Sequence, residues 1–200
     1  MEIKRKLLDE EYNNLYVTSD THFNHNKEFV FKARGYNNPT DMTNHMIGVI
    51  NETVGPSGIL LHLGDFCLNT FLPGFISILN RLTVKELWLL NGNHNNPHSR
   101  LDYRELNTPY PITQLGDYFT FRHSKKCYVC FHFPLMVWDG VNQGSAHLCG
   151  HSHGDLSYSR PENKENKILD CGWDIWKRPL HIKEIEKIMD KKNIASVHHD

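Results

Sequence analysis

The chain has 200 residues, 39% of them hydrophobic, and a formal net charge of −1 at pH 7. This length supports one sizeable hydrophobic core, so we expect a single domain over residues 1–200. The near-neutral charge and the lack of a long lysine or arginine run argue against a dedicated duplex-binding protein. The amino-terminal residues are charged and no apolar run reaches membrane-spanning length, so we expect a soluble, cytoplasmic protein without a membrane partner.

Short apolar runs that stop at a polar or glycine-containing motif recur along the chain. Their length and their content of Leu, Val, Ile and aromatic residues are typical of buried strands. We expect such strands at residues 15–18, 59–63, 87–90, 127–131 and 146–149.

Between these runs, apolar residues spaced by three and four predict helices. Met42, Met46 and Ile50 form one such stripe after Pro39, with Thr40 as the expected N-cap. Similar stripes near residues 75–79 and 182–189 predict two more helices. Strands alternating with helices, followed by a strand-rich region from about residue 115 to 171, favour an α/β fold with mixed sheets, and a two-sheet core flanked by helices would accommodate both regions.

The five cysteines are scattered through apolar runs, which favours reduced thiols over a disulfide framework. Cys127 and Cys130 form one C-x-x-C pair, which could be half of a zinc knuckle or a redox pair. No second pair follows, and the surrounding residues read as a buried strand. We therefore interpret these cysteines as packing residues.

Each polar motif follows the carboxyl end of its predicted strand, where the ligand sites of open α/β sheets gather. In chain order the motifs are Asp-x-His, Gly-Asp, Gly-Asn-His, a lone His and Gly-His-x-His. One such motif is expected by chance in a chain with fourteen histidines, but the ordered set of five is not. The glycines serve as turn residues and, without a Cβ, also let backbone and ligands crowd together. The motifs predict one site built from Asp20, His22, Asp65, Asn93, His132, His151 and His153.

The order and residue types of these motifs resemble the calcineurin-like metallophosphoesterases, from about Leu15 to the final helix. Ser-Asp-Thr-His-Phe-Asn-His at 19–25 and His-Leu-Gly-Asp-Phe at 62–66 resemble the small bacterial and viral branch of that superfamily. The resemblance implies a double β-sheet sandwich flanked by helices, with two metals bridged at the strand ends.

Two cations about 3.5 to 4 Å apart need a bridging group, and the carboxylate of Asp65 is the candidate. Carboxylate, imidazole and amide ligands suit Mn, Fe, Ni, Co or Zn and argue against a thiolate site. We expect two divalent ions, with manganese as the first choice. The resemblance implies two ligand groups around the bridge: Asp20, His22 and His153 for one metal, and Asn93, His132 and His151 for the other.

A water shared by two such metals has a lowered pKa and can attack phosphorus, while the cations neutralise charge on the phosphoryl oxygens. The leaving oxygen still needs a proton, and His94 resembles the catalytic acid of the family, the alternative being a loop histidine in solvent. Family members usually place Asp or Glu directly after Gly-Asn-His, whereas this chain has Asn95. A neutral amide supports an imidazolium less, which would weaken the acid.

Three further residues are candidate substrate contacts. Arg34 could clamp a phosphate oxygen with its fork of donors, the alternative being a surface arginine. Asn24 and His25 follow the Asp-x-His turn and could face the substrate, although turn capping explains them nearly as well. His62 lies on a predicted strand and could be a core histidine or one that supports a ligand.

These observations favour phosphoester hydrolysis. Phosphoprotein phosphatases of this superfamily carry Gly-Asp-x-x-Asp-Arg-Gly, whereas here Phe-Cys-Leu-Asn follows Gly64 and Asp65, which argues against a protein phosphatase. We expect a phosphodiesterase acting on a nucleotide or another small phosphodiester. The first alternative is a nuclease or nucleic-acid end-processing enzyme, for which nucleic acid is a substrate only. A non-catalytic metal-binding scaffold is the alternative of another class, but scaffolds tend to lose ligands and none is missing here.

Overall fold

The computed structural model describes residues 3–68, 72–94, 102–156 and 165–194, whose strands form two five-stranded sheets. The first sheet has the order β10-β2-β3-β4-β5 and the second the order β1-β6-β7-β8-β9. The strands are β1 Ile3–Lys6, β2 Leu15–Thr18, β3 Ile59–His62, β4 Glu86–Leu90, β5 Ile112–Gly116, β6 Tyr118–His123, β7 Lys126–Phe131, β8 Ala146–Cys149, β9 Ile168–Asp170 and β10 Leu180–His181. The helices are α1 Asp9–Asn13, α2 Glu28–Ala33, α3 Pro39–Val54, α4 Leu72–Arg81, α5 Trp173–Trp176 and α6 Ile182–Met189, with short 3-10 helices η1 Tyr103–Glu105 and η2 Val141–Gln143.

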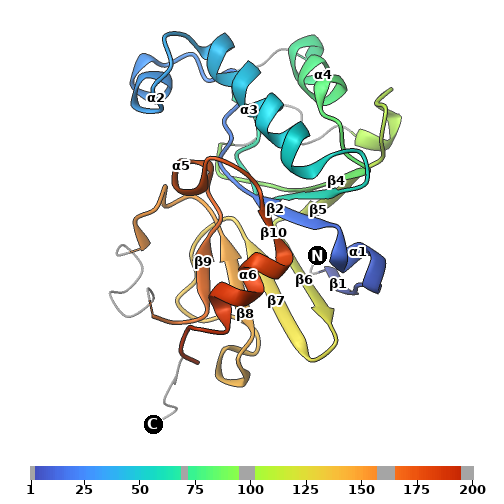
Figure 1. Cartoon of the computed structure of the whole chain (residues 1–200), viewed down its shortest axis with the longest axis vertical. Coiled ribbons are helices and arrows are strands. Elements are labelled where there is room, and N and C mark those ends of the chain that lie inside the picture. Colours follow the sequence, from blue (N-terminus) through green and yellow to red (C-terminus); the bar gives the residue numbers. More distant parts are fainter. Residues whose placement is uncertain (1–2, 69–71, 95–101, 157–164, 195–200) are drawn as a thin grey trace.

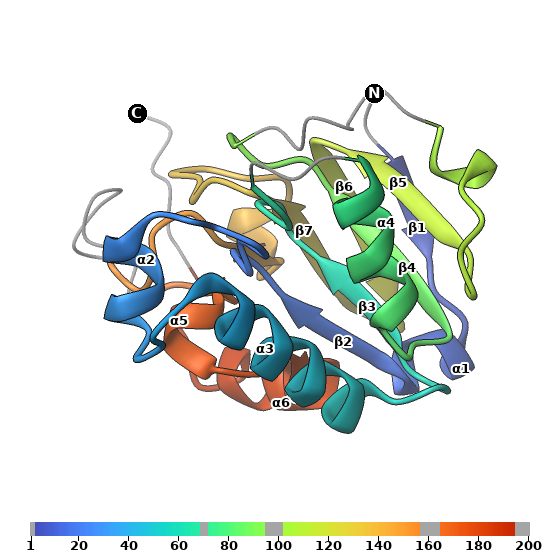
Figure 2. The same cartoon turned by 90° about the horizontal axis from the view of Figure 1, so that it is seen from above.

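Both sheets are mixed. In the first sheet, β2 to β5 run parallel and β10 pairs antiparallel with β2. In the second sheet, only the β6–β7 pair is antiparallel among the pairs of described strands. The second sheet packs on one face of the first, while α3 and α4 cover the other face (Figures 1 and 2). The prediction of a double-sheet α/β sandwich with mixed sheets is confirmed.

Alternating side chains of the first sheet build two hydrophobic layers. Leu15 and Val17 of β2 are buried in the layer between the sheets, together with Leu61 of β3. Leu60 of β3 and Leu87 of β4 are buried in the layer beneath α3 and α4. Because both faces of these parallel strands are covered, nearly every residue is apolar, which is why short apolar runs located them.

Helix α3 begins two residues earlier than the sequence predicted. Oδ1 of Asn38 accepts a hydrogen bond from the backbone N–H of Asp41 at 2.8 Å, so Asn38 is the N-cap and the prediction of Thr40 is wrong. Pro39 occupies the first helical position, where its missing N–H costs nothing. The predicted apolar stripe of α3 is buried against the first sheet.

The five cysteines are all free thiols. Cys130 lies in β7, is completely buried in the layer between the sheets, and burial raises its pKa. Four of the five cysteines are buried, as packing residues would be, whereas Cys127 is partly exposed. In the described part of the chain, no helix combines the length and the apolar character needed to span a membrane.

The carboxyl ends of strands from both sheets meet at one end of the sandwich. The register places Thr18 of β2 beside His62 of β3, and His62 beside Leu89 of β4. Ser19, just beyond β2, forms a bridge with Gly172, just beyond β9, and so joins the ends of the two sheets. The turns that follow these strands hold the polar motifs.

Candidate metal centre

The predicted metal ligands come together beyond the ends of β2, β3, β4, β7 and β8. Potential ligand atoms of Asp20, His22 and His153 lie within 4.8 Å of one another, and so do those of Asp20, Asp65 and His132. Asp20 belongs to both groups and is completely buried. Residues separated by more than 100 positions in the sequence thus form one cluster.

Asn93 joins two histidines on the other side of this cluster. Its Oδ1 lies 2.8 Å from Nε2 of His132 and 2.8 Å from Nδ1 of His151. His151 is also tied to the first group, because its backbone N–H donates to Oδ2 of Asp20 at 2.9 Å. The three side chains implied for the second metal are therefore in mutual contact.

Asp65 lies between His22, a ligand implied for one metal, and His132, a ligand implied for the other. Its Oδ2 is 3.7 Å from Nε2 of His22 and 3.5 Å from Nε2 of His132. Its Oδ1 accepts a hydrogen bond from the backbone N–H of His94 at 3.0 Å. A carboxylate oxygen placed between imidazoles of two groups has the position that a bridging ligand needs.

Burial leaves polar groups at the centre that a bound cation would satisfy. Burial raises the pKa of Asp20, whose Oδ1 is buried without a hydrogen-bond partner among the described residues. Burial also acts to raise the pKa of Asp65, but the hydrogen bond and charge of His132 outweigh it and lower that pKa to about 2. Burial lowers the pKa of His22 to about 3. A neutral imidazole and an unpartnered buried carboxylate oxygen are groups that a divalent cation satisfies, so these residues fit a metal.

Five of the predicted ligands have a left-handed backbone. The φ angle is 55° at Asp20, 49° at His22, 54° at Asp65, 65° at His151 and 47° at His153. Residues other than glycine rarely adopt this conformation, which costs on the order of 1 kcal/mol or more each and occurs preferentially at functional sites. The turns that carry the predicted ligands therefore bear a backbone cost at this cluster.

The glycines of the motifs allow the turns to approach the carboxylates. A Cβ at Gly92 would overlap Oδ1 of Asp65, and a Cβ at Gly150 would overlap Oδ2 of Asp20. The predicted crowding at these glycines is confirmed.

Two of the predicted ligands have their rings oriented by hydrogen bonds. Nδ1 of His132 donates to the carbonyl oxygen of Leu63 at 3.1 Å, which leaves Nε2 facing Asp65. Nδ1 of His153 donates to Oδ2 of Asp174 at 2.6 Å. Histidines that bind metals commonly use their other ring nitrogen in this way.

Arg34 is held by protein acceptors beside the centre. Its side chain is only 4% exposed, and its Nε and Nη2 donate to the two carboxylate oxygens of Asp174 at 2.8 and 2.9 Å. Nη1 donates to the carbonyl oxygen of Thr21 at 2.7 Å, and Nη2 to that of Asp20 at 2.8 Å. The alternative of a surface arginine is wrong. The expected phosphate contact stays a prediction, and a phosphate oxygen would compete with these four hydrogen bonds.

Asn24 contacts helix α3, and His25 makes a contact within its own turn. Oδ1 of Asn24 accepts from the hydroxyl of Thr43 on α3 at 3.2 Å, and Nδ1 of His25 accepts from the N–H of Lys27 at 3.2 Å. The ring of His25 is buried, with its centroid 5.8 Å from that of His22. Substrate contact by either residue stays a prediction.

His62 supports the centre from the core. It is completely buried, and its Nε2 donates to the hydroxyl of Thr21 at 2.9 Å, while its Nδ1 accepts from the N–H of Gly64 at 3.3 Å. These bonds connect the turn after β2 with the turn after β3, which confirms that His62 is a core histidine that supports ligands.

Two supporting carboxylates were not predicted. Oδ2 of Asp170 accepts from the hydroxyl of Ser152 at 2.5 Å and from the N–H of Gly154 at 2.9 Å, which fixes the turn at 150–154. Asp170 ends an apolar run, so the pattern used for the other strands could have found it. Asp174 lies on α5 and follows no such run, so the sequence carries no comparable signal for it.

His94, the expected acid, has an exposed side chain at the centre. Its ring centroid lies 5.6 Å from that of His22, with the two rings 70° apart. The ring is therefore beside the predicted ligands and open to solvent, where a leaving group could reach it. Asn95 lies outside the described residues.

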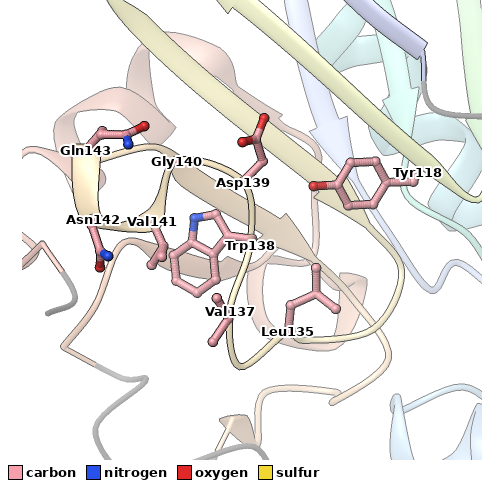
Figure 3. Close-up of a pocket in the computed structure, with 9 residues that line it drawn as sticks. All are labelled: Tyr118, Leu135, Val137, Trp138, Asp139, Gly140, Val141, Asn142 and Gln143. Atoms are coloured by element: carbon pink, nitrogen blue, oxygen red, sulfur yellow. The ribbon is translucent and has the colours of Figure 1, made fainter. Parts of the chain in front are cut away.

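A pocket of about 470 Å³ lies apart from the predicted ligands, none of which lines it. It is formed by Tyr118 at the start of β6 and by residues of the segment 135–143, including Trp138 (Figure 3). Tyr118 and Trp138 pack in a cluster on the face of the second sheet that is turned away from the first. This pocket is separate from the candidate metal centre.

No family model matches the chain, and no curated protein matches its sequence. Among solved structures, a protein of unknown function from Aquifex aeolicus is similar with a TM-score of 0.63 and 18% identity, over 87% of this chain and 98% of that one. The phosphoesterase Yfce from E. coli is matched with a TM-score of 0.43 and 16% identity, over 79% of this chain and 77% of that one. At these identities the Aquifex protein shows a shared fold and no more.

Proposed function

We propose that this chain is a two-metal phosphoesterase that hydrolyses phosphodiesters of nucleotide or similar size. The observation that supports the proposal most directly is the position of Asp65, whose Oδ2 lies between His22 of one ligand group and His132 of the other. Two divalent cations bound there, manganese being our first choice, would lower the pKa of a shared water and neutralise the phosphoryl oxygens.

The residues of the chain then have distinct tasks. Asp65 would bridge the cations, and the remaining predicted ligands would complete each one as the resemblance implies. His94 would donate a proton to the leaving oxygen, because its ring is exposed and stands beside His22. Asp174 and the carbonyl oxygen of Leu63 would keep His153 and His132 in their binding orientations.

The site favours a small ester over a long polyanion. The net charge of −1 gives the chain no overall positive charge that would attract a nucleic-acid backbone. Arg34, beside the centre, is already paired with Asp174 and two carbonyl oxygens. Affinity would therefore come from the cations and from contacts with one small molecule.

The test is a panel of phosphomonoesters, phosphodiesters, cyclic nucleotides and oligonucleotides assayed with added Mn²⁺. Asp65→Asn is compared with Asp190→Asn, the same change at an exposed carboxylate that pairs with Lys126. We expect the highest kcat/KM on a small diester, a loss of 100-fold or more in Asp65→Asn, and no change in Asp190→Asn. Preference for oligonucleotides would favour a nuclease instead, and a metal-loaded protein that hydrolyses none of the panel would be a scaffold.

A further inference from the structure

Phe133 places an exposed aromatic ring at the candidate metal centre. It directly follows His132, and its ring centroid lies 5.2 Å from that of His132 and 4.5 Å from that of His151. Despite these contacts, the residue is 37% exposed. Single apolar residues on a surface are common, but this ring packs against two predicted ligands that follow two different strands, so a molecule bound at the centre would meet it.

The backbone around Phe133 is fixed by a buried histidine. Nδ1 of His147 donates to the carbonyl oxygen of Val129 in β7 at 3.0 Å, and its Nε2 accepts from the N–H of Leu135 at 3.1 Å. His147 is completely buried in β8. The backbone on both sides of Phe133 is thus tied to His147, so little loop freedom remains to be lost when a ligand packs on the ring.

Phe29 is a useful contrast. It is 74% exposed on α2, and among the ring contacts of the described residues its partner is His25, at 6.1 Å, which is a candidate substrate contact but not a predicted metal ligand. The two phenylalanines are thus both exposed, but only Phe133 is in direct ring contact with predicted ligands. The position of Phe133, rather than its exposure, sets it apart.

We propose that Phe133 determines specificity by stacking on the nucleobase of a nucleoside phosphoester whose phosphate lies at the cations. The inference rests on the proposed function and narrows its substrate class. In a nucleoside phosphate the base lies one sugar away from the phosphate, and Phe133 contacts the imidazoles of two predicted ligands, so a base beside a phosphate bound at the centre could reach its ring. An aromatic ring stacks on every base, so the contact selects nucleosides over alkyl esters without selecting one base.

Binding gives the first test, because it requires no turnover. With Mn²⁺ present, we expect the wild-type chain to bind adenosine 5′-monophosphate about tenfold more tightly than inorganic phosphate. A gain of this size is what stacking of one base on one aromatic ring contributes to affinity. Phe133→Ala should abolish this preference and Phe133→Trp should keep it. Phe29→Ala is the matched control and should also keep it. Equal affinities in the wild type, or a preference that survives in Phe133→Ala, would overturn the inference.

Turnover separates this inference from the proposed function. Thymidine 5′-(p-nitrophenyl phosphate) and ethyl p-nitrophenyl phosphate release the same leaving group and differ in the nucleoside. We expect kcat/KM to be about tenfold higher for the nucleoside ester, and this ratio to approach one in Phe133→Ala but not in Phe29→Ala. A metal-loaded wild type that hydrolyses neither ester contradicts the proposed function. Hydrolysis of both with a ratio unchanged in Phe133→Ala contradicts only the role of Phe133.

Discussion

Nδ1 of His153 donates a hydrogen bond of 2.6 Å to Asp174, and the same carboxylate receives two hydrogen bonds from Arg34. Burial acts to raise the pKa of Asp174, but the hydrogen bonds from His153 and Arg34 outweigh it and lower that pKa well below its usual range. The ionised carboxylate fixes the ring so that Nε2 of His153 is the nitrogen left for a metal. Arg34 in turn joins Asp174 to the turn that carries Asp20.

Asp174→Asn should weaken metal binding although Asp174 is not itself a predicted ligand. Loss of such a supporting carboxylate typically costs about 10- to 100-fold in affinity. Titration calorimetry with Mn²⁺ measures the effect, and Asp190→Asn, which alters an exposed partner of Lys126, is the control. Equal affinities of the two variants would show that Asp174 does not support the centre.

Gly92→Ala should disturb Asp65. The added Cβ would overlap Oδ1 of Asp65, so the carboxylate must move and the bound metal content should fall. Gly48→Ala is the matched control, because a Cβ at this position of α3 has no atom within 4 Å and should stabilise the helix by about 0.5–1 kcal/mol. Metal analysis and thermal unfolding of both variants check the prediction, which fails if Gly92→Ala retains the full metal content.

His94→Gln should slow hydrolysis most for esters whose leaving group must be protonated to depart. An alkoxide or ribose oxygen leaves poorly without protonation, whereas nitrophenolate departs without it. We expect kcat to fall by about 100-fold or more for an alkyl or nucleoside ester and far less for a nitrophenyl ester. An equal fall for both classes of ester would assign His94 a role other than the general acid.

The strand ends could be predicted because buried parallel strands read as apolar runs and their polar motifs follow directly. This logic located β2, β3, β4, β7 and β8 to within one residue at each end, together with the residues that meet beyond them. It also located the core helices α3, α4 and α6, whose apolar stripes are buried.

The remaining features of the fold and the site depend on long-range contacts, which produce no local pattern in the sequence. The bond between Arg34 and Asp174 joins residues 140 positions apart, so neither the burial of Arg34 nor the role of Asp174 could be read from spacing. The two-residue strand β10 and the edge strand β1 are defined by their pairing partners rather than by composition. The Thr40 prediction failed because Asn38 forms the cap one residue before Pro39.

The buried His147 should make stability fall on mild acidification. Burial lowers its pKa to about 4, against about 6.5 in the unfolded chain, so the unfolded state binds more protons between these values. The contribution of neutral His147 to the free energy of unfolding is therefore fully present above pH 6.5 and is lost as the pH falls towards 4. The loss amounts to about 2 kcal/mol between pH 6.5 and 5. Urea unfolding of the apoprotein gives the free energy of unfolding at each pH. In His147→Asn this free energy should depend less steeply on pH than in the wild type, by the slope that corresponds to about one proton. An unchanged slope would show that His147 is not held neutral by the fold.

The central claim is that Asp65 bridges two metals, and metal content measures it most directly. After incubation with Mn²⁺ and removal of free ion, atomic absorption should find close to two equivalents per wild-type chain. Asp65→Asn should retain fewer than one, because it weakens both sites, whereas His132→Gln should retain about one. One or no metal in an active wild-type chain, or two in Asp65→Asn, would contradict the account.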